Sequence, residues 1–206
     1  MKLFHILPFV AVALAAAVLQ DDGPTSTLDS QTGLPSNYSV SDIEWRGFED
    51  FNEDQVFTGT IENVINQMRQ IKGAHYTPSF VSKAESQVFK TKPDYHAANH
   101  DILCGGSEAD PRRIDQGVDY LNHLPDSALC SNPPKTCGRI SCSWNSAILW
   151  CNDKTDPGDA HKCNMFGQYA AEIVDKCAIY DTNPRVCGRN SDDQLVLSVL
   201  VKKESC

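Results

Sequence analysis

The sequence predicts a small α+β fold, a disulfide-rich α/β sandwich in which two helices cover one face of an antiparallel sheet. Three observations support this fold class. All nine cysteines of the 206-residue chain lie between Cys104 and Cys206, two amphipathic helical patterns occur in the same half, and that half also contains several segments of strand character. Helices on one face of an antiparallel sheet are a stable way to bury a single core. We therefore expect residues 101–206 to form the folded domain, preceded by a partly disordered N-terminal arm.

The first helix of this domain is expected after Asp110. Aspartate accepts hydrogen bonds from free backbone N–H groups at a helix start, and a proline such as Pro111 fits the first helical position. Apolar residues then recur at helical spacing until Pro125 ends the pattern. The second helix is expected over residues 164–177, where the apolar stripe consists of Phe166, Ala170, Ile173, Val174 and Cys177.

Strand character is clearest in residues 141–151 and 194–203, with residues 138–142 as a further short candidate. In the last strand, Leu195, Leu197, Val199 and Val201 alternate with Val196, Ser198 and Leu200. This period of two is typical of a strand. In residues 141–151 the same period predicts that Trp144 and Trp150 share one strand face.

The first seventeen residues decide how the cysteines are interpreted. Lys2, an apolar run and small residues at Ala13, Ala15 and Ala17 are typical of a secretory signal peptide, residues 1–17, that is cleaved before Val18. The run is shorter than the ~20 apolar residues that span a bilayer. In an oxidising compartment, nine cysteines indicate a disulfide framework rather than zinc ligands. We expect a secreted, extracellular protein with no cofactor, no metal and no membrane insertion.

Residues 18–100 differ in composition from the rest of the chain. From Asp21 to Glu62 there are ten acidic residues and one basic residue, Arg46, whereas the remaining mature chain is nearly neutral. Nucleic-acid binding requires a basic surface, so no nucleic-acid partner is expected. Residues 18–45 contain few apolar positions and are expected to be disordered. The sequon at Asn37 predicts an N-glycosylated protein.

One helix is expected in this acidic region, following Thr58-Gly59-Thr60 and ending at Gly73. Its apolar face consists of Ile61, Val64, Ile65, Met68 and Ile71. We interpret residues 18–100 as a pro-region or accessory arm that docks this helix on the folded half. His96 and His100 lie four residues apart but lack a third metal ligand, so we interpret them as solvated loop residues.

The order of cysteine motifs points to a family. The segments "ILCGG", "KTCG" and "NSAILW" are followed by a helix bracketed by Cys163 and Cys177, then by "RVCG" and a strand ending at Cys206. Over residues 102–206 this order resembles the calcium-channel-blocking killer toxins of smut fungi and the killer-toxin-like proteins that other fungi secrete. The resemblance implies an α/β sandwich with an antiparallel sheet and two helices.

The resemblance also implies a disulfide connectivity. Its four pairs are Cys104–Cys177, Cys130–Cys163, Cys137–Cys142 and Cys151–Cys206. In the toxins the equivalent of Cys187 pairs with a second cysteine shortly after the first, which this chain lacks, so Cys187 is expected to be a free thiol. Lys135 in "KTCG" matches a toxin lysine that is linked to channel blocking and is the candidate target-binding residue. The neighbouring toxin arginines are missing, and a lone exposed lysine is usually only solvated.

Three functions are compatible with these features. The first is a non-enzymatic fungal effector or toxin-like virulence protein that binds a protein of a host or competitor cell, with a calcium channel as the specific version. The second is a small secreted hydrolase such as a ribonuclease, which needs a His/Glu or Ser/His/Asp constellation. The cysteine-rich half contains only His123 and His161, and its glutamates, Glu108, Glu172 and Glu204, belong to no recognisable motif. The third is a cell-wall or antimicrobial protein, and the near-neutral domain argues against membrane disruption. We expect no enzymatic activity.

Overall fold

The computed structural model describes residues 34, 36–87, 101–158 and 160–206. The expected signal peptide, His96 and His100 lie outside the described residues. Among the residues described, no helix is long and apolar enough to cross a membrane. In the same ranges no group of three or more His, Cys, Asp or Glu side chains is arranged to hold a metal ion.

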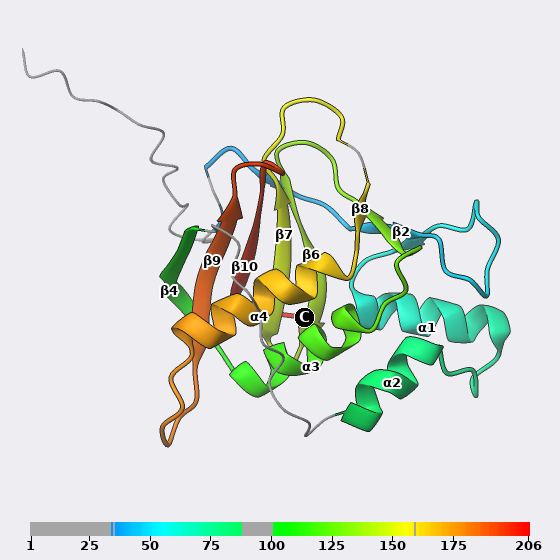
Figure 1. The fold of residues 1–206 in the computed structure, drawn as a ribbon, viewed down its shortest axis with the longest axis horizontal. Coiled ribbons are helices and arrows are strands. Elements are labelled where there is room, and N and C mark those ends of the chain that lie inside the picture. Colours follow the sequence, from blue (N-terminus) through cyan, green and yellow to red (C-terminus); the bar gives the residue numbers. More distant parts are fainter. Residues whose placement is uncertain (1–33, 35, 88–100, 159) are drawn as a thin grey trace, which may run out of the picture.

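A six-stranded sheet forms the centre of the molecule, with the strand order β1-β6-β7-β10-β9-β4 (Figure 1). All neighbouring strands are antiparallel except the short parallel pair β1–β6. In sheet order, the strands are Ser39–Val40, Thr136–Ser143, Ser146–Asn152, Leu197–Lys203, Val186–Asp192 and Asp101–Ala109. Helices α3 (Pro111–Asn122) and α4 (Met165–Cys177) pack on one face of this sheet. The predicted α+β class with two helices on one sheet face is confirmed.

Local signals explain where the two helices begin. The Asp110 carboxylate accepts a hydrogen bond from the backbone N–H of Arg112, so α3 starts at the expected N-cap. Helix α4 buries Phe166, Ala170, Ile173 and Val174 against the sheet, as the predicted stripe requires. In β7, Ile148 and Trp150 pack in this core, whereas Ala147, Leu149 and Cys151 belong to a smaller cluster on the alternate positions.

The segment expected to be one strand over residues 141–151 is a hairpin. Strands β6 and β7 are joined by the two residues Trp144 and Asn145, and both have left-handed backbone angles, with φ of 50° and 58°. The turn reverses the chain, so the alternation does not continue through it. Trp144 is 75% exposed and Trp150 is 1% exposed. The expectation that these two tryptophans share a face is therefore wrong.

The N-terminal arm contains more regular structure than expected. Strands β2 (Glu44–Arg46) and β3 (Phe57–Thr58) join β5 (Leu129–Ser131) and β8 (His161–Lys162) in a second, four-stranded sheet. Helix α1 (Ile61–Lys72) is the expected helix, with Thr60 as its N-cap and Gly73 at its end. A second helix, α2 (Ser79–Gln87), follows. The expectation of a single helix in this region is wrong.

The described part of residues 18–45 is also ordered, contrary to expectation. Leu34, Ile43 and Trp45 are buried, and the indole N–H of Trp45 donates a hydrogen bond to the carbonyl of Gly59 at 2.8 Å. Ile43 and Trp45 belong to the same core as Trp150 and Phe166 of the cysteine-rich half. Composition alone suggested disorder because it counts only the apolar surface that a segment carries. Here the few apolar residues are buried against a core that another segment supplies.

Two of the four implied disulfides are confirmed, and two are wrong. Cys104–Cys177 and Cys130–Cys163 are formed, but the other bonds are Cys137–Cys151 and Cys142–Cys206 instead of Cys137–Cys142 and Cys151–Cys206. Cys137 and Cys151 face each other across the β6–β7 hairpin with a Cα–Cα distance of 4.0 Å. Cys137 and Cys142 are five residues apart on one strand, about 16 Å at the usual strand rise. That separation exceeds the ~7 Å limit for a disulfide. Cys187 is the free cysteine, as expected.

Candidate functional site

The turn at the tip of the β6–β7 hairpin contains a tryptophan, a residue type that is unfavourable in the backbone conformation of such turns. Two-residue hairpin loops with two positive φ angles favour Asn-Gly, because these residues tolerate the left-handed region. A bulky residue such as Trp144 at φ 50° is an outlier, and such strain is concentrated at functional sites. The side chain also gains little from burial, since three quarters of it is exposed. Neither the turn nor the core accounts for a tryptophan at this position.

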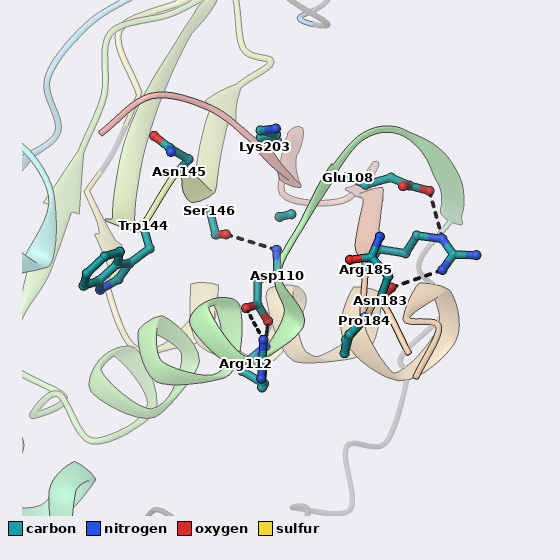
Figure 2. A pocket seen from close by; sticks show the side chains of 11 residues that line it. Glu108, Asp110, Arg112, Trp144, Asn145, Ser146, Asn183, Pro184, Arg185 and Lys203 are labelled. Atoms are coloured by element: carbon teal, nitrogen blue, oxygen red, sulfur yellow. Dashed lines mark hydrogen bonds and ion pairs between the residues drawn. The ribbon is translucent and has the colours of Figure 1, made fainter. Parts of the chain in front are cut away.

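A cavity of about 380 Å³ lies beside this tip (Figure 2). It is formed where the β6–β7 turn, the β4–α3 junction, the loop before β9 and the end of β10 meet. The lining residues are Glu108, Ala109, Asp110, Arg112, Trp144, Asn145, Ser146, Asn183, Pro184, Arg185 and Lys203. We call this cavity together with Trp144 the tip pocket. Its lining is predominantly polar, and no histidine is among these described residues.

Both carboxylates of the tip pocket are paired with arginines. Asp110 accepts two hydrogen bonds from the Arg112 guanidinium, from Nε at 3.0 Å and from a terminal nitrogen at 2.8 Å. These bonds are the main cause that holds the pKa of Asp110 below its ordinary value. Glu108 lies 3.3 Å from Nε of Arg185, which also contacts Asp181 at 2.8 Å. The pocket carboxylates are thus ion-paired, and Asp110 in particular is poorly suited to donate a proton near neutral pH.

One cationic side chain of the pocket is not compensated by a carboxylate among the residues described. Three cationic side chains, those of Arg112, Arg185 and Lys203, line it together with the two carboxylates. Within the described part of the chain, the ammonium group of Lys203 has no hydrogen-bond or ion-pair partner, although its carbonyl accepts a bond from the Ser107 hydroxyl at 3.0 Å. Next to the pocket, the Arg113 guanidinium lies over the Trp144 ring, 5.0 Å from its centroid. The ammonium group of Lys203 is therefore available to pair with a negative group of a ligand.

Lys135, the candidate target-binding residue, lies at the other end of the hairpin. Its half-buried ammonium donates to the carbonyl oxygen of Asp153 at 2.6 Å and to the hydroxyl of Tyr38 at 3.2 Å. It also lies 5.3 Å from the centre of the Tyr38 ring. Burial and a hydrogen bond to Asp153 raise the pKa of the Tyr38 hydroxyl. Lys135 is therefore not the exposed, solvated residue that was expected, because it links the arm to the cysteine-rich half through these contacts. Its role in target binding stays a prediction.

The predicted glycosylation site is sterically suitable. Asn37 lies in an exposed turn at a φ of 75°, next to Tyr38. Asparagine tolerates this left-handed conformation better than most residues. An Asn37-linked glycan stays a prediction.

The other candidate catalytic side chains are scattered. The Nδ1 atom of His123 lies 2.7 Å from the carbonyl oxygen of Asp119, and His161 packs edge-on against Trp150. Buried Glu172 accepts a hydrogen bond from Asn190 at 2.7 Å, and Glu204 lies 3.2 Å from Nζ of Lys202. Of the three glutamates considered from the sequence, only Glu108 lines the tip pocket.

The free thiol of Cys187 is not activated. Its sulfur donates to the carbonyl of Gly106 at 3.5 Å. Burial, and then the nearby charge of Glu108, raise the pKa of this thiol above its ordinary value. A thiol with a raised pKa is a poor nucleophile at neutral pH because little thiolate is present.

No protein-family model, curated protein or solved structure matches this chain. The likeness to killer-toxin-like proteins therefore stays a resemblance in cysteine order, of which two implied pairings were wrong. The tip pocket was not identified from the sequence, since its residues come from four separate segments. The only local signal is Trp-Asn between two strand-like runs, and this differs from the Asn-Gly pattern of such turns.

Proposed function

We propose that this chain is a secreted, non-enzymatic effector or toxin-like protein that acts by binding a target on a host or competitor cell, and that the tip pocket is its binding surface. The observation that carries this proposal is Trp144, which combines a left-handed backbone with 75% exposure at a hairpin tip. Such a residue strains the turn and buries little surface. Tryptophan is also one of the residue types enriched among binding hot spots.

Secretion is supported by the four disulfides, because such bonds persist in oxidising compartments. The signal-peptide pattern and the cysteine order favour a fungal virulence or killer protein. A calcium channel is the specific target that the resemblance suggests. Because Lys135 is held by Tyr38 and Asp153, we propose that contact with such a target uses Trp144 rather than Lys135.

A binding function is favoured over hydrolysis by the chemistry of the pocket. Hydrolases need a general acid or base with a suitable pKa, or an activated nucleophile. Asp110 is held ionised by Arg112, and Glu108 is paired with Arg185. The pKa of the Cys187 thiol is raised by burial. These groups position charge but are not poised to transfer protons.

Replacement of the tip residue tests the proposal. The Trp144→Asn variant should lose at least about tenfold in binding of the labelled protein to a panel of fungal cells and plant roots, since hot-spot residues contribute about 2 kcal/mol or more. Its fold should be unchanged or more stable by a few tenths of a kcal/mol, because asparagine suits the left-handed turn position. Cell binding and thermal unfolding measure the two effects separately.

Val196 provides a matched control. It is also apolar, 40% exposed and left-handed with a φ of 54°, but it lies at the opposite end of β10, next to Asp153. The Val196→Asn variant should bind cells like the wild type. Unchanged cell binding by Trp144→Asn, or an equal loss in both variants, would refute the proposed surface.

A further inference from the structure

The tip pocket has a composition that specifies a class of ligand. We propose that it binds a carboxylate-bearing sugar unit of an extracellular polysaccharide, with the carboxylate at Lys203 and the sugar ring against Trp144. This inference rests on the proposed function of the same surface. It is argued from the charges and the amide groups that line the pocket and from the exposed indole at its edge (Figure 2).

The charge pattern favours one negative group on the sugar unit that occupies the pocket. Arg112 and Arg185 are already paired with Asp110 and Glu108, so their charges are largely compensated. Lys203 is exposed, and its ammonium has no partner among the described side chains. An ammonium attracts a carboxylate as a point charge without strict geometry. An acidic peptide also offers carboxylates, but it lacks the ring C–H face and the repeated hydroxyl groups that the indole and the pocket amides complement.

The remaining polar groups suit hydroxyl groups. Asn145 and Asn183 line the pocket, and their side-chain amides have no hydrogen-bond partner within the described residues. Each amide offers both donors and an acceptor. Ser146 accepts a bond from the backbone N–H of Asp110 at 3.1 Å, so its own O–H is able to donate. Sugar hydroxyls likewise donate and accept, and they complement such mixed groups.

The exposed indole of Trp144 supplies the flat contact. Arg113 lies over the ring, yet three quarters of the side chain is exposed, so further indole surface is available. The negative face of an aromatic ring attracts positively polarised groups such as the C–H bonds of a pyranose. The cavity volume of about 380 Å³ falls within the ~300–1,000 Å³ of small-ligand pockets.

Calorimetric titration with defined oligosaccharides tests this assignment. Tetragalacturonate should bind the full secreted protein, whereas its methyl ester and neutral cellotetraose should bind at least about tenfold more weakly because they lack the charge. The Lys203→Gln variant should lose the same factor for tetragalacturonate only. Lys154→Gln is the matched control, because Lys154 follows the opposite end of β7 and should leave binding unchanged.

The outcomes separate this inference from the proposed function. Equal binding of charged and neutral oligosaccharides, no effect of Lys203→Gln, or tighter binding of a glutamate oligopeptide would each overturn the acidic-sugar assignment. Suppose that Trp144→Asn abolishes cell binding, while tetragalacturonate neither binds the wild-type protein nor displaces it from cells. The proposed function then stands and the ligand class is wrong. If Trp144→Asn binds cells normally, the proposed function itself is wrong.

Discussion

Residues 36–87 contain no cysteine, whereas residues 101–206 contain nine, yet both regions pack into one hydrophobic core. The cysteine-rich half is cross-linked by four disulfides. The arm is held by the burial of Trp45, Phe57 and Ile61, each at most 1% exposed. The disulfide bonds therefore cross-link only part of the folded unit. A segment without cysteines is equally integral when its apolar residues are buried in the shared core.

Polar contacts also attach the arm to the sheet. The Glu62 carboxylate in the first turn of α1 accepts hydrogen bonds from the Ser141 hydroxyl at 2.7 Å and from the backbone N–H of Cys142 at 3.1 Å. Ser41 donates to the side chain of buried Asn132 at 2.6 Å. Release of the arm would leave these partners and the core uncovered. We therefore expect the arm to remain bound even if the chain is cleaved as a pro-region.

The largest expected effect on stability comes from a substitution in the arm that disrupts the shared core. Trp45→Ala should lower the free energy of unfolding by about 3–5 kcal/mol, through lost burial and the cavity left behind. Urea denaturation, monitored by hydrogen exchange of backbone amides in both halves, should show one transition that includes both. Ile71→Ala, on the same arm but at a residue that is 54% exposed, should change stability by less than about 0.5 kcal/mol. Independent unfolding of the arm would contradict the single core.

Removal of single disulfides tests how strongly each bond stabilises the cysteine-rich half. The Cys142–Cys206 bond closes a loop with a sequence separation of 64, and replacing both cysteines by serine should lower the free energy of unfolding by about 4 kcal/mol. The same replacement of Cys137 and Cys151, whose separation is 14, should lower it by about 3 kcal/mol. Denaturation curves of the two double variants measure this order. Mass spectrometry of the unreduced protein checks the connectivity, provided that cleavage after Trp144 separates Cys142 from Cys151. A Cys137–Cys142 crosslink would refute the hairpin register.

A third change extends the covalent framework to the free thiol. A Cβ at position 106 would lie 4.0 Å from Cβ of Cys187, within the usual range for a disulfide. Gly106→Cys should therefore form a fifth bond and remove the free thiol, although a φ of +125° opposes the substitution by about 1–3 kcal/mol. A Cβ at position 105 would have no neighbour within 4 Å. Gly105→Cys is thus the control and should show two free thiols in a thiol titration.

The smallest effect concerns charge at the start of α3. The hydrogen bonds from Arg112 lower the pKa of Asp110 below 3.8, so the folded state favours the ionised carboxylate. The resulting stabilisation of the fold is fully present above the ordinary pKa of 3.8 and is lost as the pH falls through the lowered pKa of the folded state. Asp110→Asn keeps the cap and should be slightly less stable than wild type at pH 6, with the difference vanishing well below pH 3.8. Asp110→Ala also loses the cap, at about 1 kcal/mol. Urea midpoints across this pH range measure both. A difference between Asp110→Asn and wild type that is independent of pH would argue against the ion pair.

Local patterns predicted the helices well. Asp110 before Pro111, and Thr60 before Ile61, mark helix starts that the structure confirms, because capping depends on adjacent residues. The resemblance to the toxins also predicted the free Cys187, because the chain lacks the toxin cysteine that would pair with it. The Trp144 turn was not predictable, since Trp-Asn lacks the usual turn signature and the strand period continues through it in the sequence.

Short-range features of the sequence were sufficient to predict the fold class, α1, α3, α4 and a disulfide framework, since these depend on periodicity, capping and cysteine content. The three-dimensional fold was needed to identify the partners of Cys137 and Cys142, the burial of Trp45 and the tip pocket. Pairing depends on strand register, burial depends on the surface that a distant segment supplies, and the pocket joins residues from Glu108 to Lys203. These are relations between distant parts of the chain, and spacing along the sequence does not encode their distances in space.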